Sequence, residues 1–198
     1  MGVYINVNTK HENDADLVQQ TCRGDTKAFE QLVIKYDRQV MKLAFNMTGH
    51  PVDAQDICQD TFLRAYSKLS TFRGESSFRT WLMRIAVNQS LNHRRRKDVG
   101  RLLSLDFLRE RDGSVWEKQI SAETRNLDEG IEDAAVLDER IQTALLDLSE
   151  RERAVFVLKH EYGFRIKEIA VMLNCAQGTV KNYLFRAVQK LKKLLIEV

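Results

Sequence analysis

FRGESSFRTWLMRIAVNQSLNHRRRK, residues 72–97, is the stretch of this sequence that says most about its fold and function. It opens with a short polar loop at 73–77, held between two phenylalanines. A helical segment follows, because Phe78, Leu82, Ile85 and Gln89 recur at the spacing of one helix face. The segment ends in four consecutive basic residues at 94–97.

A helix with a buried face, a basic end and an aromatic-flanked loop suits a nucleic-acid strand whose bases have left the stack. Phosphates find cations on such a surface, and unstacked bases find aromatic rings and loop amides. The alternative is structural, since aromatic residues around a helix start are often core and basic residues at a helix end are favoured by the helix dipole. By itself, this stretch supports no more than a hypothesis that the chain binds nucleic acid.

Charge is distributed in blocks along the 198 residues. Residues 1–97 carry 15 basic and 10 acidic side chains, residues 98–148 carry 6 and 13, and residues 149–198 carry 10 and 5. Two basic blocks separated by an acidic one predict two modules that face nucleic acid and a different segment between them. The alternative is chance blockiness in a charged helical protein.

Several classes of protein are disfavoured by what the sequence lacks. The three cysteines, Cys22, Cys58 and Cys175, form no CxxC pair, so neither a disulfide framework nor a zinc site is expected. The first 16 residues lack the apolar core of a signal peptide, and no apolar run is long enough to span a membrane. No nucleophile motif, paired carboxylates or phosphate-binding loop appears. We therefore expect a cytoplasmic protein that is not an enzyme, needs no cofactor and is not inserted in a membrane.

The first half of the chain is predicted to be a bundle of about four helices. A short helix from Asp14 ends near Gly24, and Asp25 caps the next helix, whose apolar residues repeat from Phe29 to Met47. Gly49-His50-Pro51 ends that helix. A third helix is predicted from Asp53, with an inward stripe of Ala54, Ile57, Cys58, Thr61, Phe62, Ala65 and Leu69. Its other side carries Gln55, Asp56, Gln59, Asp60, Leu63 and Arg64, for which solvation is the simplest interpretation.

Residues 98–130 show weak periodicity and are interpreted as a partly extended linker. Helical patterns return from Ile131, first with Val136, Ile141, Ala144, Leu145 and Leu148. Ser149 and Glu152 form a capping box for a helix that ends near Gly163.

The C-terminal sequence predicts two helices joined by a short turn, which is the helix-turn-helix arrangement. The first has its apolar stripe at Ile166, Ile169, Ala170 and Leu173. The last has its stripe at Val180, Leu184, Ala187, Leu191 and Leu195. Away from that stripe the last helix carries Lys181, Asn182, Arg186, Gln189, Lys190 and Lys193. Such side chains reach base edges and phosphates in a major groove, although other helical pairs mimic this pattern.

Taken together, these segments resemble the extracytoplasmic-function (ECF) group of bacterial sigma factors, in the sigma-70 family. DAQDICQDTF at 53–62 is similar to the family's DAxDxxQxxF segment. Residues 72–88 are similar to its promoter-melting and −10-reading segment. GTVKNYLFRA at 178–187 is similar to its GTVKSRLxRA recognition helix, and the family's EIAxxL pattern precedes it at 168–173. The resemblance covers residues 14–97 and 132–195.

The resemblance implies an all-α fold of two small helical domains on a flexible linker. These are a region 2 domain at 1–97, a linker at 98–131 and a region 4 helix-turn-helix domain at 132–198. The implied partners are core RNA polymerase, promoter DNA and an anti-sigma factor. The linker is implied to thread toward the RNA exit path.

The resemblance also assigns site residues. The −10 element, as a single strand, is assigned to Phe72, Arg73, Gly74, Glu75, Ser76, Ser77, Arg79, Trp81, Arg84, Asn88, Arg94, Arg95 and Arg96. The −35 element, as a duplex, is assigned to Gln177, Gly178, Thr179, Lys181, Asn182, Tyr183, Arg186 and Lys190. Docking on the polymerase is assigned to Asp53, Asp56, Gln59, Asp60 and Arg64. The loop and Asn88 are implied to hold a flipped base while arginines hold phosphates.

Several positions depart from the family pattern, the mildest being Leu148-Ser149 in place of the family's frequent Leu-Pro. Ala176 stands where a capping Ser is usual, so that cap is missing or comes from elsewhere. Asn174 replaces a turn Gly, which Asn can do because it tolerates left-handed geometry. Asn182 and Tyr183 replace the common Ser-Arg, which changes the expected −35 preference. The alternative function is a free-standing helix-turn-helix regulator, which would need a dimerising surface and palindromic half-sites.

Overall fold

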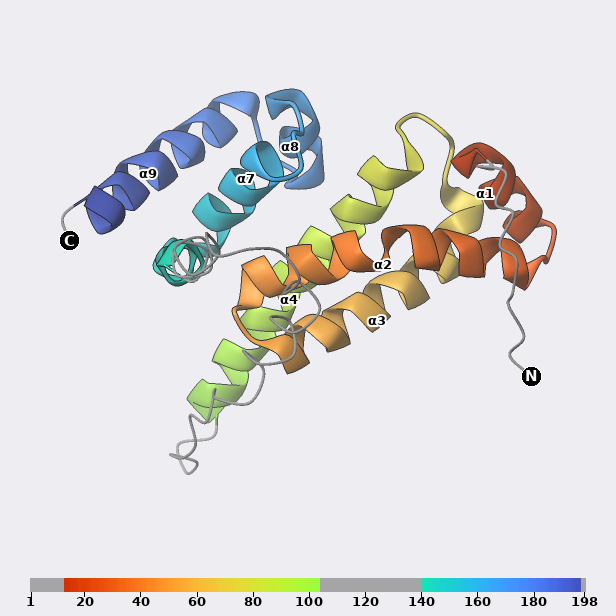
Figure 1. Ribbon diagram of the computed structural model, residues 1–198, viewed down its shortest axis with the longest axis horizontal. Helices are drawn as coiled ribbons and strands as arrows, with labels where there is room; N and C mark the ends of the chain where they lie inside the picture. The colour runs from red at the N-terminus through yellow and green to blue at the C-terminus, as the bar shows by residue number, and fades with distance from the viewer. Residues whose placement is uncertain (1–12, 104–139, 197–198) are drawn as a thin grey trace, which may run out of the picture.

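The computed structural model describes residues 13–103 and 140–196, and the side chains of 94–103 and 195–196 lie outside the description. Within these ranges all regular structure is helical, as predicted (Figure 1). The N-terminal module comprises α1 (Asp14–Cys22), α2 (Thr26–Thr48), α3 (Pro51–Lys68), the 3-10 turn η1 (Leu69–Thr71) and α4 (Phe78–Leu103). The C-terminal module comprises a helical stretch at 140–146, α7 (Glu150–His160), α8 (Ile166–Met172) and α9 (Gln177–Ile196).

The starts and ends of the N-terminal helices follow from local chemistry. The Asp25 carboxylate accepts hydrogen bonds from the backbone N–H groups of Lys27 and Ala28, as its predicted capping role requires. Gly49 ends α2 in the left-handed conformation, with φ at 68°. The prediction that α3 begins at Asp53 is wrong by two residues. Pro51 occupies the first turn of α3, where its missing N–H costs nothing.

The core of the N-terminal module lies among α2, α3 and α4, which pack side by side (Figure 1). The predicted stripe from Ala54 to Leu69, which runs along α3 and ends on the first residue of η1, is buried at all seven positions. Leu32, Leu43 and Leu82 have no exposed surface, and each buried Leu contributes roughly 1.5–3 kcal/mol relative to an exposed one.

Helix α4 is buried on more sides than its predicted stripe suggested. Met83, Ala86 and Val87 are as fully buried as Leu82, whereas Ile85 is only partly buried. The cause is that α4 contacts α2 and α3 on one side and α8 of the C-terminal module on another. The helix extends to Leu103, six residues past the predicted domain boundary at Lys97. The rest of the predicted linker, 104–131, lies outside the described residues.

The C-terminal module has the predicted helix-turn-helix. The Glu152 carboxylate accepts a 3.1 Å hydrogen bond from the Ser149 backbone N–H, which forms the predicted capping box. Asn174 has φ at 48°, so the left-handed turn that the sequence predicted is present. At the start of α9, the Ala176 carbonyl accepts from the N–H groups of Thr179 and Val180. Backbone hydrogen bonds therefore form the first turn of α9, at the position where the family has a capping Ser.

The two modules pack against each other, with the C-terminal module resting on α2 and α4 (Figure 1). Buried apolar residues of both modules form one continuous cluster. No helix within 13–103 or 140–196 combines the length and the apolar character that crossing a membrane needs.

Candidate nucleic-acid and polymerase interfaces

The polar loop before α4 is anchored by three aromatic rings. The ring centroids of Phe72 and Trp81 are 5.3 Å apart, and Phe78 lies 6.0 Å from Phe72 and 5.8 Å from Trp81. Phe78 is only 3% exposed, so it is core, whereas Phe72 and Trp81 are half-buried. The main role of the three rings is therefore to hold the loop in place. Of the three, only Phe72 and Trp81 keep exposed surface on which a base could stack.

The loop itself projects into solvent. All five residues from Arg73 to Ser77 are exposed, and Gly74 adopts a left-handed φ of 71°. The Ser77 hydroxyl accepts a 3.1 Å hydrogen bond from the Thr80 N–H, which caps the start of α4. The exposed loop therefore leads directly into a capped helix start.

Two of the residues assigned to −10 DNA instead contact the C-terminal module. The Arg79 guanidinium donates 3.4 Å hydrogen bonds to the Tyr162 carbonyl and lies 5.0 Å from the centre of the Phe164 ring. The Asn88 side-chain amide donates to the Met172 carbonyl at 3.1 Å. Arg84, between them on α4, is exposed. The side chains of Arg94, Arg95 and Arg96 lie outside the described residues.

The face of α3 assigned to polymerase docking is divided by its contacts. Asp56, Gln59 and Arg64 point into solvent. Asp60 is also exposed, but its carboxylate accepts a 3.4 Å hydrogen bond from Gln89 on α4. Asp53 is mostly buried and lies 3.3 Å from the Nε2 atom of His93. The acids nearest α4 therefore help to hold the bundle together.

An apolar groove between α2 and α3, which the sequence did not predict, borders this face. Its volume is about 710 Å³. It is lined by Phe29, Val33, Asp37, Met41, Gln55, Cys58, Gln59, Phe62, Leu63 and Tyr66. Leu63 is 69% exposed and Tyr66 is 48% exposed. The signal in the sequence was a Leu at position 63, on the otherwise polar side of α3.

One groove residue, Cys58, has a raised pKa. Burial is the larger cause and the nearby Asp37 carboxylate is the second, and together they raise the pKa of Cys58 to about 12. The Cys58 thiol therefore stays protonated.

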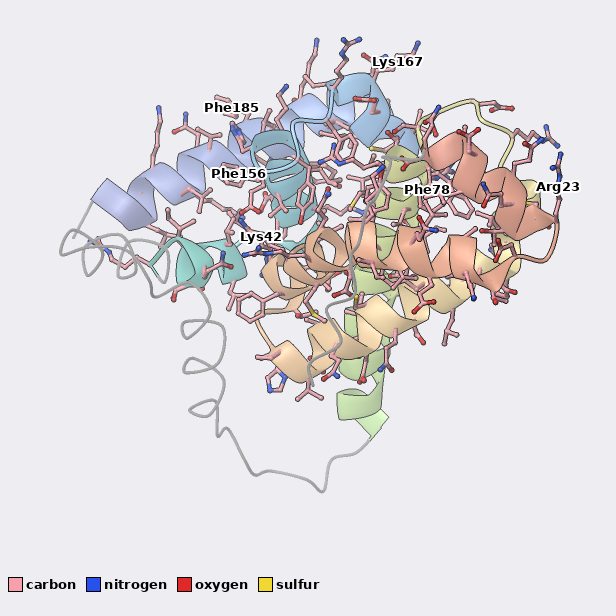
Figure 2. The ribbon with its side chains drawn as sticks, turned by 45° about the vertical axis from the view of Figure 1, so that its right-hand side comes forward. Arg23, Lys42, Phe78, Phe156, Lys167 and Phe185 are labelled. Carbon is pink, nitrogen blue, oxygen red and sulfur yellow. The ribbon has the colours of Figure 1, made fainter. Side chains whose placement is uncertain are left out.

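Helix α9 presents a row of exposed side chains on the side away from α7 and α8. Lys181, Asn182 and Arg186 are exposed, and Tyr183 is half-buried. Phe185, which was not among the predicted site residues, is 66% exposed on the outer side of the helix (Figure 2). An exposed Phe between Asn182 and Arg186 adds apolar surface to a polar row, which suits a groove that contains thymine methyl groups.

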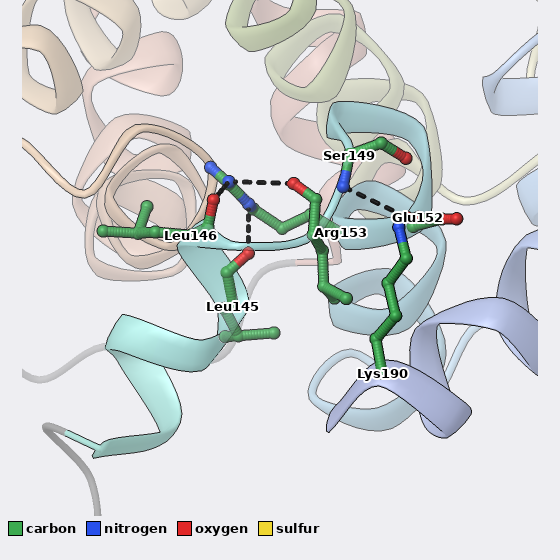
Figure 3. Close-up of polar contacts among 7 residues, drawn as sticks. Leu145, Leu146, Ser149, Glu152, Arg153 and Lys190 are labelled. Carbon is green, nitrogen blue, oxygen red and sulfur yellow. Dashed lines mark hydrogen bonds and ion pairs between the residues drawn. The ribbon is translucent and has the colours of Figure 1, made fainter. Parts of the chain in front are cut away.

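Lys190, also assigned to −35 DNA, is engaged within the module. Its ammonium donates a 2.7 Å hydrogen bond to the buried Glu152 carboxylate on α7 (Figure 3). Burial alone would raise the pKa of Glu152, but hydrogen bonds from Lys190 and Ser149 outweigh it and lower the pKa. Glu152 is thus an ionised anchor that joins the start of α7 to the middle of α9.

Both modules match sequence families. Residues 32–99 match Sigma-70 region 2, and residues 138–191 match Sigma-70, region 4. The RNA polymerase sigma-H factor of Pseudomonas aeruginosa is 35% identical over 188 residues, which cover 93% of this chain and 94% of that protein. The ECF RNA polymerase sigma factor SigW of Bacillus subtilis is 33% identical over 183 residues, 90% of this chain and 94% of that protein.

Solved structures that are similar over most of the chain include two complexes. The sigma factor RpoE in complex with the anti-sigma factor NepR, from Bartonella quintana, is 25% identical with a TM-score of 0.66, covering 86% of this chain and 98% of that one. CnrH in complex with the cytosolic domain of CnrY is 28% identical with a TM-score of 0.65, covering 94% and 99%. A free-standing regulator would share only its helix-turn-helix with such proteins, so matches across both modules disfavour that alternative.

Proposed function

The chain belongs to the ECF group of the sigma-70 family and acts as an RNA polymerase sigma factor, and we propose how its surfaces divide that work. The N-terminal module docks on core polymerase and holds the opened −10 strand. The C-terminal module reads the −35 duplex. No bond is made or broken in these steps, so the chain acts as a recognition subunit without catalysis of its own, and it works in the cytoplasm.

The observation that carries the −35 assignment is the exposed row on α9. Lys181, Asn182 and Arg186 supply donors for base edges and phosphates, and Phe185 supplies apolar contact. The helix-turn-helix, whose turn includes the left-handed Asn174, carries this row on its exposed side. We exclude Lys190 from the DNA contacts, because its pairing with Glu152 positions α9 instead.

The −10 assignment rests on the exposed loop 73–77 and the polar side of α4. The loop offers backbone groups to a flipped base, and the half-buried Trp81 offers part of a ring face. Arg84 is free to hold a phosphate, whereas Asn88 must first release Met172. In this proposal, the N-terminal module promotes promoter melting by capturing a base of the −10 strand that has already left the stack.

For docking on polymerase, we propose that the polar face and the groove act as one surface. Asp56, Gln59 and Arg64 give the charged rim, and Leu63 and Tyr66 give an exposed apolar centre. An apolar centre with a polar rim is the usual anatomy of a protein–protein interface. Exposed apolar patches of this kind on a small domain also mark such interfaces.

We further propose that an anti-sigma factor holds the chain inactive. Two of the solved structures similar to this chain over most of its length are complexes, one of a sigma factor with the anti-sigma factor NepR and one of CnrH with the cytosolic domain of CnrY.

The function is tested by transcription from a genomic template library with core polymerase, with and without the chain. We expect start sites that depend on the chain and that share two upstream elements. If the purified chain ignored core polymerase but bound an intact symmetric operator tightly, the proposed function would be wrong.

A further inference from the structure

Two positions near the start of α9 carry residues that the packing of the protein does not require. Gly178 and Asn182 lie one turn apart on the helix, and both are exposed. Gly and Asn are weaker helix formers than Ala, so each lowers the intrinsic stability of the helix. This cost is explained if the two residues serve a contact outside the protein.

Gly178 is not needed for the fold. A methyl group added at this position would meet no atom within 4 Å, so no neighbouring group occupies the space. The φ of Gly178 does not lie in the left-handed region, unlike that of Gly49 or Gly74, so the backbone does not need a glycine there. The missing side chain therefore leaves open surface on the first turn of α9.

The Asn182 side-chain amide is available to an external partner. No hydrogen bond to this amide is formed within the part of the chain that the structure describes. The amides of Asn46 and Gln89, by contrast, donate to the carboxylates of Glu161 and Asp60. An unpaired amide on the exposed side of a helix keeps both its donors and its acceptor for a ligand.

The two features combine on one side of α9. Residues four apart face the same way, and helical side chains point back toward the N-terminus, so the Asn182 side chain lies over the turn that holds Gly178. A side chain at position 178 would stand beside the amide and narrow the approach to it. Phe185 is 66% exposed and lies three residues further on (Figure 2). Along the helix, the amide thus has open surface before it and an exposed ring after it.

The chemistry of an amide selects one base. The major-groove edge of adenine presents an acceptor at N7 and a donor at N6, and an Asn amide pairs with both. Lys181 and Arg186, the exposed cations nearest in the row, carry donors only, which suits phosphates and the two acceptors of guanine. Among these three side chains, Asn182 is therefore the one that matches adenine. It lies in the second turn of α9, and the N-terminal part of a recognition helix is the part that contacts base edges.

We propose that Asn182 fixes one base of the −35 element as adenine, and that Gly178 allows the base edge to come close enough for both hydrogen bonds. This rests on the proposed function, because it takes α9 as the reader of the −35 duplex. It adds the identity of one base, the residue that selects it and the reason for a glycine one turn earlier.

The test uses the full-length chain assembled with core polymerase on a promoter that depends on the chain. The −35 element is randomised, the −10 element is held constant, and sequencing of the transcripts gives the preference for each base at each position. We expect wild type to favour adenine at one position by at least about fivefold, the lower end of discrimination by a good base contact. Asn182→Ala should remove the preference at that position alone. Asn182→Asp carries acceptors only and should shift the preference toward cytosine, whose N4 amino group is a donor.

Gly178→Ala tests the close approach separately from the amide. The melting temperature should stay the same or rise, because Ala is the better helix former and its methyl group has room. Transcription from the promoter that carries the preferred adenine should nevertheless fall at least about fivefold, as one good base contact is worth. Gln189→Ala is the matched control, since it removes an exposed amide two turns further along the same side of α9. It should leave the preference at the Asn182 position unchanged.

An adenine preference that persists in Asn182→Ala would overturn the proposal, as would wild-type transcription by Gly178→Ala. Either result leaves the proposed function standing if wild type still depends on the −35 duplex. If scrambling that duplex had no effect on transcription by wild type, the assignment of α9 as its reader would itself be wrong.

Discussion

The Asn88 side-chain amide donates a 3.1 Å hydrogen bond to the Met172 carbonyl oxygen, which lies 84 residues away in the other module. This one contact joins the middle of α4 to the end of α8, immediately before the turn that leads to α9. A side chain that the family resemblance assigns to a base is thus satisfied by the protein's own backbone.

Asn88→Ala should lower promoter opening about tenfold while leaving the affinity for core polymerase unchanged, since a good base-edge contact contributes about 1–3 kcal/mol. Opening is measured by permanganate reactivity of unpaired thymines. Trp81→Ala should lower opening too, but it should also lower the melting temperature, because Trp81 packs on Phe72 and Phe78. Equal loss of opening and of polymerase affinity in Asn88→Ala would contradict the assignment.

Asp56→Arg should weaken binding to core polymerase by about 1–2 kcal/mol, on the order of tenfold. The residue is exposed beside the groove, so reversing its charge changes the docking surface and not the fold. Affinity is measured by fluorescence titration with labelled core enzyme. Asp147→Arg, an exposed acid of the C-terminal module, is the matched control. Unchanged affinity in Asp56→Arg would remove α3 from the docking surface.

Arg186→Ala and Lys190→Ala should separate reading from positioning on α9. Arg186→Ala should flatten the base preference at the −35 element by about 1–3 kcal/mol without lowering stability, because the side chain is exposed. Lys190→Ala should keep the preference but lower the melting temperature, because it leaves the buried Glu152 unpaired. Binding to a library of −35 duplexes and thermal unfolding are the two measurements. The reverse pattern would show that Lys190 reads DNA.

Arg153→Lys should lower the free energy of unfolding by about 1–3 kcal/mol. Arg153 is fully buried and donates to the carbonyls of Leu145 and Leu146 at 2.6 Å (Figure 3). It also donates to the carbonyl of Met47, in the other module, at 2.6 Å. A Lys ammonium cannot reproduce this planar fork of donors. Arg151→Lys, exposed on the same helix, is the control in urea denaturation. Similar stability of both variants would argue against a bridging role.

The ionised Glu152 should make the C-terminal module sensitive to acid. Its folded pKa lies below the unfolded value of about 4.3, so its contribution is fully present above that pH and is lost as the pH falls through the folded pKa. Glu152→Gln should lower stability at neutral pH and reduce the difference between pH 7 and pH 3. Chemical denaturation of both chains at the two pH values measures this. Parallel pH profiles would show that Glu152 does not titrate with folding.

The sequence alone determined the helices, their caps and the helix-turn-helix, because these depend on residues a few positions apart. The Asp25 cap, the Ser149–Glu152 capping box and the left-handed Asn174 were all predicted, and all are present. The family also followed from the sequence, since its three motifs are contiguous stretches.

Only the tertiary structure decided which polar side chains are free. Lys190 carries the charge expected of a DNA contact, yet it is paired with Glu152, 38 residues away. Asn88 is occupied by Met172, and the groove beside Leu63 exists only where α2 and α3 meet. Periodicity shows whether a side chain leaves its own helix inward or outward. It does not show which neighbouring element packs against that side chain, because that depends on how segments far apart in the sequence come together.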